Sequence, residues 1–251
     1  MNTSHAFEVG ERPRLEIRVP SGRVDIARGV PGRIEIEVSG PGRDRVEVGQ
    51  FGDTVVVGRP DGFGRGKVNV AAIVPEGCDV EANLGAADLR ADVAVGDASI
   101  RSAAGDVRLE SAKNLMVSLA SGDLDVEEIR GRARITTASG DVAVRAVDGD
   151  LVCSTASGDV AIGDVTGEVT VKTASGDVRL SRCEGSEVRV STVSGDTCVG
   201  LPPGRRVEVD INSLTGRVRL PERAQTGDAE PRSTVRLRCV SVSGDVEVRR
   251  A

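Results

Sequence analysis

The sequence predicts an all-β solenoid, a β-helix-like stack of coils about eighteen residues long, each coil made of two nine-residue half-turns. Three observations support this prediction. The triplet Ser-Gly-Asp recurs at a nearly constant spacing, apolar residues hold fixed positions relative to its glycine, and the 251 residues include no Trp or Tyr and only three Phe. A core without large aromatic rings suits a narrow interior lined by Val, Ile, Leu and Ala on strands.

The repeat is defined by the central glycine of each Ser-Gly-Asp triplet or degraded triplet. These are Gly105, Gly122, Gly140, Gly158, Gly176, Gly195, Gly216 and Gly244. Their spacing is 17 to 19 residues as far as Gly195 and then loosens to 21 and 28. A unit with one short strand and one turn per nine residues cannot bury its apolar face alone. Stacked units pair backbone to backbone at about 4.8 Å and align their side chains in columns.

The apolar columns give the expected inward positions. Counted from each glycine they lie at +2, +4, +7, +11, +13 and +16, and a second glycine lies at +9. In the coil that begins at Gly158 the inward residues would be Val160, Ile162, Val165, Val169, Val171 and Ala174. The Val-x-Val alternation is the period of a half-buried strand. Gly accepts a positive φ at the turn, and the Asp carboxylate can bind nearby backbone amides.

The chain before these repeats is less regular. Short alternating segments such as RLEIRV, RIEIEV and DTVVV are separated by Gly and Pro turns. Residues 1–75 are therefore predicted to be an irregular β-strand cap over the open edge of the first coil. Residues 76–251 are predicted to hold the solenoid repeats, with a surface loop at 221–232.

Composition limits the function. The net charge is −6 and the pI near 5.1, and the few Phe residues cannot build a stacking platform, so no nucleic-acid partner is expected. No apolar run is long enough for direct membrane insertion. The N-terminus lacks a signal-like apolar stretch, and the five cysteines show no CxxC spacing, so a cytoplasmic location with free thiols is expected.

The sequence offers few residues from which a catalytic or metal site could be built. His5 is the one histidine, and the GGxGxD motif of calcium-binding nonapeptide rolls is absent, so the sequence predicts no enzyme, no metal site and no cofactor. A row of aspartates, one per coil, could bind cations, or each could cap its own turn; the structural role is favoured. Cys153, Cys183 and Cys239 fall in inward columns, whereas Cys198 falls at an outward position.

A hydroxyl ladder is the candidate partner-facing site. Its residues are Thr137, Ser139, Thr155, Ser157, Thr173, Ser175, Thr192 and Ser194. Each Thr/Ser pair flanks a position taken as inward, which would turn both hydroxyls outward in rows. Such an array could dock a partner, or it could only stabilise the sheet through cross-strand contacts.

The repeated motif T-A-S-G-D-V, the lead-in Val74-Pro75-Glu76-Gly77 and the mixed strands before it resemble the bacterial "putative adhesin" β-strand-repeat family, also called the toastrack domain. The resemblance covers roughly residues 15–251. It implies a β-solenoid, no established catalytic residues, and frequent association with envelope-stress or membrane-linked modules.

Three functions from different classes fit these features. The favoured one is a non-catalytic cytoplasmic scaffold or protein-interaction module with a protein partner. The second is a bactofilin-like structural solenoid that forms homo-oligomers through its ends; here residues 238–251 would form the C-terminal edge, with Arg249 and Arg250 as charges that oppose stacking. The third, a β-helix carbohydrate-active enzyme, lacks a carboxylate-lined groove in the repeats.

Overall fold

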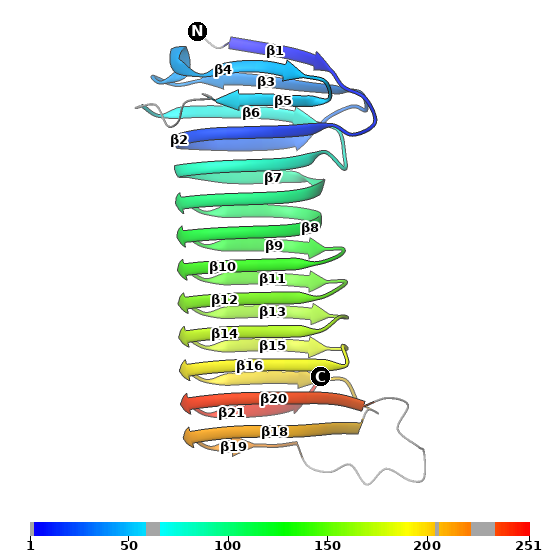
Figure 1. Cartoon of the computed structure of the whole chain (residues 1–251), viewed down its shortest axis with the longest axis vertical. Coiled ribbons are helices and arrows are strands. Elements are labelled where there is room, and N and C mark those ends of the chain that lie inside the picture. The colour runs from blue at the N-terminus through cyan, green and yellow to red at the C-terminus, as the bar shows by residue number, and fades with distance from the viewer. Residues whose placement is uncertain (1–2, 59–65, 204–205, 222–233) are drawn as a thin grey trace. The chain divides into compact units, whose positions relative to one another are not determined.

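The computed structural model describes residues 3–58, 66–203, 206–221 and 234–251. They form two compact units, Met1–Arg130 and Gly131–Ala251. Strands dominate both units, and the predicted all-β solenoid is confirmed (Figure 1). The division into a cap at 1–75 and repeats at 76–251 stays a prediction, and the predicted loop at 221–232 lies outside the described residues except for Pro221.

The described residues of the first unit form nine strands and one turn of 3₁₀-helix. They are β1 (Thr3–Glu8), β2 (Arg14–Arg28), β3 (Arg33–Ser39), η1 (Arg43–Arg45), β4 (Glu47–Phe51), β5 (Thr54–Gly58), β6 (Val68–Val74), β7 (Asp79–Ala104), β8 (Val107–Ser121) and β9 (Leu124–Ile129).

Strand β2 already behaves as a coil of the solenoid. It pairs in parallel with β7 on one side and with β5 and β6 on the other, and it turns at Gly22, where φ is +131°. Its alternating side chains, such as Leu15 and Val24, are buried. The antiparallel pairs β1–β3, β3–β6 and β4–β5 complete the irregular part of the unit, and β7, β8 and β9 continue in parallel (Figure 1).

In the second unit, the part of the chain that the structure describes forms twelve strands. They are β10 (Ala133–Ser139), β11 (Val142–Val147), β12 (Leu151–Ser157), β13 (Val160–Val165), β14 (Val169–Ser175), β15 (Val178–Cys183), β16 (Glu187–Ser194), β17 (Thr197–Leu201), β18 (Arg206–Thr215), β19 (Val218–Arg219), β20 (Thr234–Ser243) and β21 (Val246–Arg250).

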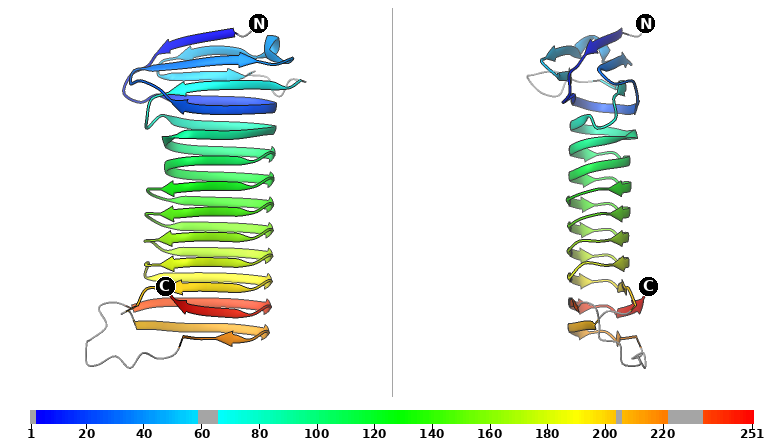
Figure 2. Two further views of the ribbon diagram at one scale, coloured as in Figure 1. Left: turned by 180° about the vertical axis from the view of Figure 1, so that it is seen from behind. Right: turned by 90° about the vertical axis from the view of Figure 1, so that its right-hand side faces the viewer.

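These strands form two parallel stacks, because each coil contributes one strand to each stack (Figure 2). The first stack runs β10, β12, β14, β16, β20, β18, and the second runs β11, β13, β15, β17, β21, β19. The register shifts by the predicted eighteen residues per coil, as in Ala133↔Leu151 and Val142↔Val160.

The core between the stacks follows the predicted columns with one exception. The +2, +4, +7, +11 and +13 positions are buried, as shown by Val160, Ile162 and Val165 on the second stack. The prediction that the +16 residue points inward is wrong. Ala156 and Ala174 are exposed, and the preceding residues, Thr155 and Thr173, are buried instead. The strand keeps strict alternation through Leu151, Cys153 and Thr155, so the third inward side chain is a threonine.

The turn glycines are required by the close approach of successive coils. At Gly158 φ is +121°, and a Cβ there would lie 2.2 Å from the carbonyl oxygen of Gly140. The second glycine of each coil meets the same steric constraint. Gly167 shows it without a positive φ, because a Cβ there would lie 2.3 Å from the backbone of Gly149. Both glycine columns therefore let backbone stack directly on backbone.

The last coils do not follow chain order. Strand β20 lies between β16 and β18, and β21 lies between β17 and β19. The expectation that residues 238–251 form the terminal edge is therefore wrong. Arg249 belongs to an interior strand and bonds to Glu247 at 2.7 Å. Among the described residues of this unit, β18 and β19 each pair on one side only, which leaves their other edge open.

Candidate functional site

The hydroxyl ladder divides into an outer row and an inner row. Ser139, Ser157, Ser175 and Ser194 are exposed, as expected. The threonines are not outward: Thr137, Thr155, Thr173 and Thr192 are only 3% to 7% exposed. Their predicted orientation is wrong because they take the third inward position of each strand, which the sequence pattern had assigned to the neighbouring alanine or valine.

Burial of these threonines is stabilised by bonds within each coil. The Oγ1 hydroxyl of Thr155 donates to the carbonyl oxygen of Ser157 at 3.1 Å, and Thr173 repeats this with Ser175 at 3.1 Å. Thr137 does the same at 3.3 Å. Thr192 departs from the pattern, since its buried hydroxyl has no hydrogen-bond partner among the described residues. In the first three coils the threonine hydroxyls are thus used within the fold.

The outward positions that were expected to hold the threonine side chains are occupied by a column of apolar residues. The residue two positions before each turn glycine points outward on the first stack. In stacking order the column consists of Ala138, Ala156, Ala174, Val193, Val242 and Leu214. The side chains grow along it, and Val193 is 53% and Leu214 78% exposed. A contiguous exposed apolar surface on a regular sheet marks a candidate binding face.

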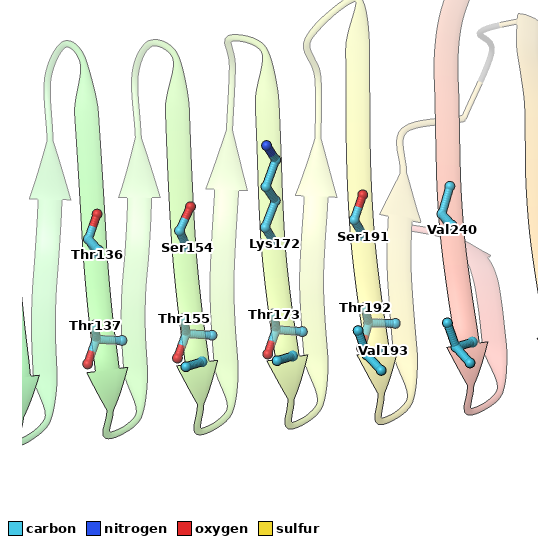
Figure 3. A pocket seen from close by; sticks show the side chains of 13 residues that line it. Thr136, Thr137, Ser154, Thr155, Lys172, Thr173, Ser191, Thr192, Val193 and Val240 are labelled. Carbon is cyan, nitrogen blue, oxygen red and sulfur yellow. The ribbon is translucent and has the colours of Figure 1, made fainter.

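A shallow groove of about 550 Å³ runs beside this column, across β10, β12, β14, β16 and β20. Its lining residues are Thr136, Thr137, Ser154, Thr155, Ala156, Lys172, Thr173, Ala174, Ser191, Thr192, Val193, Val240 and Val242. Figure 3 shows Thr136, Ser154, Lys172, Ser191 and Val240 in a row parallel to the threonine row. The groove therefore has one hydroxyl-rich side and one apolar side, and its volume is in the range of small-ligand sites.

The charge on this groove face is positive. Lys172 is exposed in the middle of the groove, and Arg134 is exposed on β10; neither forms an ion pair within the described part of the chain. Arg189 and Arg238 extend the basic character but are held by Glu187 at 2.7 Å and Asp210 at 3.6 Å. No Asp or Glu is among the residues that line the groove.

The aspartate row has a structural role on the other side of the turns. The backbone N–H of Asp159 donates to Oδ1 of Asp141 at 2.8 Å, and Asp177 donates in the same way to Asp159 at 2.8 Å. Each carboxylate therefore caps the turn of the next coil, whereas the sequence suggested its own turn. The charge-assisted bonds tie successive coils together.

Within the described ranges, no cluster of three or more His, Cys, Asp or Glu side chains could hold a metal ion. No helix in the part of the chain that the structure describes is long and apolar enough to cross a membrane.

The cysteines follow their predicted columns. Cys153, Cys183 and Cys239 are buried, and burial raises the pKa of each thiol to about 12. Cys78 is buried too, and desolvation together with the charge of Asp79 raises its pKa to about 12. Cys198 is partly exposed.

These thiols predict a simple reactivity pattern. In the native protein at about pH 8, only Cys198 of the five should react promptly with a thiol reagent such as DTNB, because the thiolate is the reactive form and the other four are buried and protonated. Cys198→Ser should abolish the fast phase, and denaturation of the wild type should release all five thiols. A second fast thiol in the native protein would contradict the burial.

The missed features of the site are the apolar column and Lys172. The signal that could have found the column is the Ala, Val or Leu two residues before every turn glycine, combined with strict alternation from the two preceding inward residues. Lys172 stands out only once the groove is known.

Comparison with known proteins identifies relatives of the whole chain. A family model described as Toastrack DUF4097 matches residues 6–249. No curated protein matches. A "putative adhesin" from Bacteroides fragilis is 11% identical with a TM-score of 0.42, and the alignment covers 98% of this chain and 97% of that one. A "putative lipid binding protein" from Parabacteroides distasonis is 10% identical with a TM-score of 0.45, covering 97% and 96%.

Proposed function

The chain belongs to the toastrack family, and on that premise we propose that it is a non-catalytic interaction module that docks a protein partner on the groove face of its second unit. The single observation that carries this proposal is the exposed apolar column beside the groove. Exposed Val193, Val242 and Leu214 are not needed for the core, which lies on the other side of the same strands. Repeat proteins commonly bind along such an extended face.

The similar solved structures are named for adhesion or lipid binding and not for a reaction. The cytoplasmic location and a scaffold role in envelope-stress or membrane-linked systems are parts of this proposal. Cell fractionation of the native host would test the location directly.

The proposal is tested by a paired pull-down from the native host. Val193→Asp combined with Val242→Asp should abolish recovery of a specific partner, because a charge would replace apolar contact area at two neighbouring steps of the column. Both positions are exposed, so the fold should survive. The matched control is Ala143→Asp with Ala161→Asp, two exposed positions on adjacent strands of the second stack. Equal loss in both variants, or none in the first, would contradict the proposed face.

A second candidate function is self-assembly through the open coil. Val209 on β18 and Val218 on β19 are exposed apolar side chains on strands with an unpaired edge, and Leu220, directly after β19, is exposed too. Glu208 and Asp210 on β18 oppose those registers with a second β18 that would place two of these carboxylates opposite each other. A concentration-dependent sedimentation coefficient that Val209→Lys removes would favour this candidate over the groove.

A further inference from the structure

We infer that the groove binds an acidic amphipathic α-helix of a partner protein, lying along the stacking direction of the coils. This inference rests on the proposed function and adds the class of partner. Three features of the groove favour such a helix: the spacing of the coils, the hydrogen-bonding groups of the groove floor and the charges at its rim.

The spacing of the groove matches a helix. The five strands that line it are stacked at about 4.8 Å, so the groove runs for about 19 Å. An α-helix rises about 5.4 Å per turn, so about three and a half turns lie over these five strands, nearly one turn per coil. At about 1.5 Å of rise per residue, apolar side chains at i, at i+3 or i+4, at i+7 and at i+10 or i+11 would then lie near successive steps of the column from Ala156 to Val242.

An extended peptide fits less well in this direction. Its side chains on one face repeat about every 6.7 Å, which is out of step with the coils. Its backbone N–H and C=O groups would also need partners from the groove. On the floor, Thr137, Thr155 and Thr173 already donate to serine carbonyl groups of their own coils, and among the described floor threonines only the Thr192 hydroxyl has no partner. A helix satisfies its own backbone and needs only side-chain contacts.

The sign of the charge selects an acidic helix. Lys172 and Arg134 have no ion pair among the described residues, and no carboxylate lines the groove. A helix with Glu or Asp beside its apolar stripe would place carboxylates near both cations. Lys172 is the one charged side chain among the described residues that line the groove, and its charge is opposite in sign to the net charge of −6 of the whole chain.

A second copy of the chain is a poorer occupant. The described residues contain no α-helix, only the 3₁₀ turn Arg43–Arg45. Two groove faces packed together would bring the unpaired cations of both copies into one interface, which costs affinity. The occupant that we infer is therefore a helix of another protein.

The test uses synthetic peptides on the full-length protein. The probe is a fluorescent Leu/Glu/Ala peptide about eighteen residues long with Leu at i, i+3, i+4 and i+7, which spans about 27 Å as a helix. One control has the same composition in scrambled order, and another replaces each Glu with Lys. Fluorescence anisotropy should show the acidic amphipathic peptide binding at least about tenfold more tightly than either control.

Variants connect the binding to the groove. Lys172→Glu should reverse the preference, weakening the acidic peptide at least about tenfold and strengthening the Lys peptide. Val193→Asp should weaken both. Lys113→Glu, at an exposed position of the first unit, should leave both affinities unchanged.

Two results would overturn the inference. Equal binding of the ordered and scrambled peptides, or the same affinity for Lys172→Glu as for wild type, would show that no helix is selected at this groove. If no peptide binds while the Val193/Val242 double variant still loses its partner in the pull-down, the proposed function stands and the helical partner is wrong. If both experiments fail, the groove face is not a docking surface.

Discussion

Replacing Val160 with Asp should lower the free energy of unfolding by about 4 kcal/mol or more, one of the two largest effects expected in this chain. Val160 is 1% exposed and lies between Val142 and Val178 in the inward column of the second stack. Its inward neighbours in that column are aliphatic, so a carboxylate there would have no cation or donor in its column. The variant must either bury a charge or bind a proton, and both destabilise the folded state.

Ala161→Asp is the matched control, because the next residue along the same strand points outward. Ala161 is exposed and lies beside Arg179 in register, so an added carboxylate stays solvated and has a basic neighbour. The expected change is within about 0.5 kcal/mol. Chemical denaturation followed by circular dichroism compares the two variants. Equal midpoints would show that the inward and outward residues of β13 are misassigned.

The regular part of the fold was predictable because the same physical requirement recurs in every coil. A glycine is needed wherever backbone stacks on backbone, so the Gly140 to Gly195 spacing fixed the coil length, and alternation from Val160 to Ile162 fixed the inward face. Even Gly22, far from the clear repeats, marks a coil by its positive φ.

The sequence pattern assigned the wrong residue to the last inward position of each first-stack strand, and the reason is physical. Hydrophobicity favours Ala156 over Thr155 as the buried residue, but a threonine can be buried when its hydroxyl finds an acceptor. The carbonyl of Ser157 supplies that acceptor within the same coil. The alanine is then left outside, which creates the apolar column that the sequence pattern placed in the core.

The order of the last coils could not be read from local pattern. Strands β18 and β20 have similar alternation, and any two such strands can pair in parallel. The longer spacings after Gly195 showed that the repeat changes but not that β20 would lie between β16 and β18. The open edge therefore lies on β18, where the sequence offered no sign of it.

The other large effect is expected at the turn glycines. Gly176→Ala should destabilise the second unit by about 3 kcal/mol or more, because two costs add. The φ of Gly176 is +123°, a backbone conformation that residues other than glycine rarely adopt. The new Cβ would also lie 2.2 Å from the carbonyl oxygen of Gly158, a backbone atom that cannot rotate away.

The damage should spread to the neighbouring coils, since relief of this clash requires the two turns to separate. Separation weakens the bond from Gly158 N–H to the Ser175 carbonyl at 3.2 Å and the bond from Asp177 N–H to Asp159 Oδ1 at 2.8 Å. Hydrogen exchange with mass spectrometry should therefore show faster exchange on β13 to β16, at both sides of the substituted turn.

Gly52→Ala separates the two costs. Gly52 has a positive φ of +61°, but no atom lies within 4 Å of its would-be Cβ, so only the conformational cost of about 1–2 kcal/mol remains. Gly163→Ala gives the opposite case: its Cβ would lie 2.0 Å from the Arg145 carbonyl oxygen, without a positive φ. Local exchange around each site should rank Gly176→Ala as most destabilising, Gly163→Ala as intermediate or equal, and Gly52→Ala as least. If Gly176→Ala costs no more than Gly52→Ala, the coils do not stack as closely at their turns as the structure shows, and the glycine repeat reflects turn conformation alone.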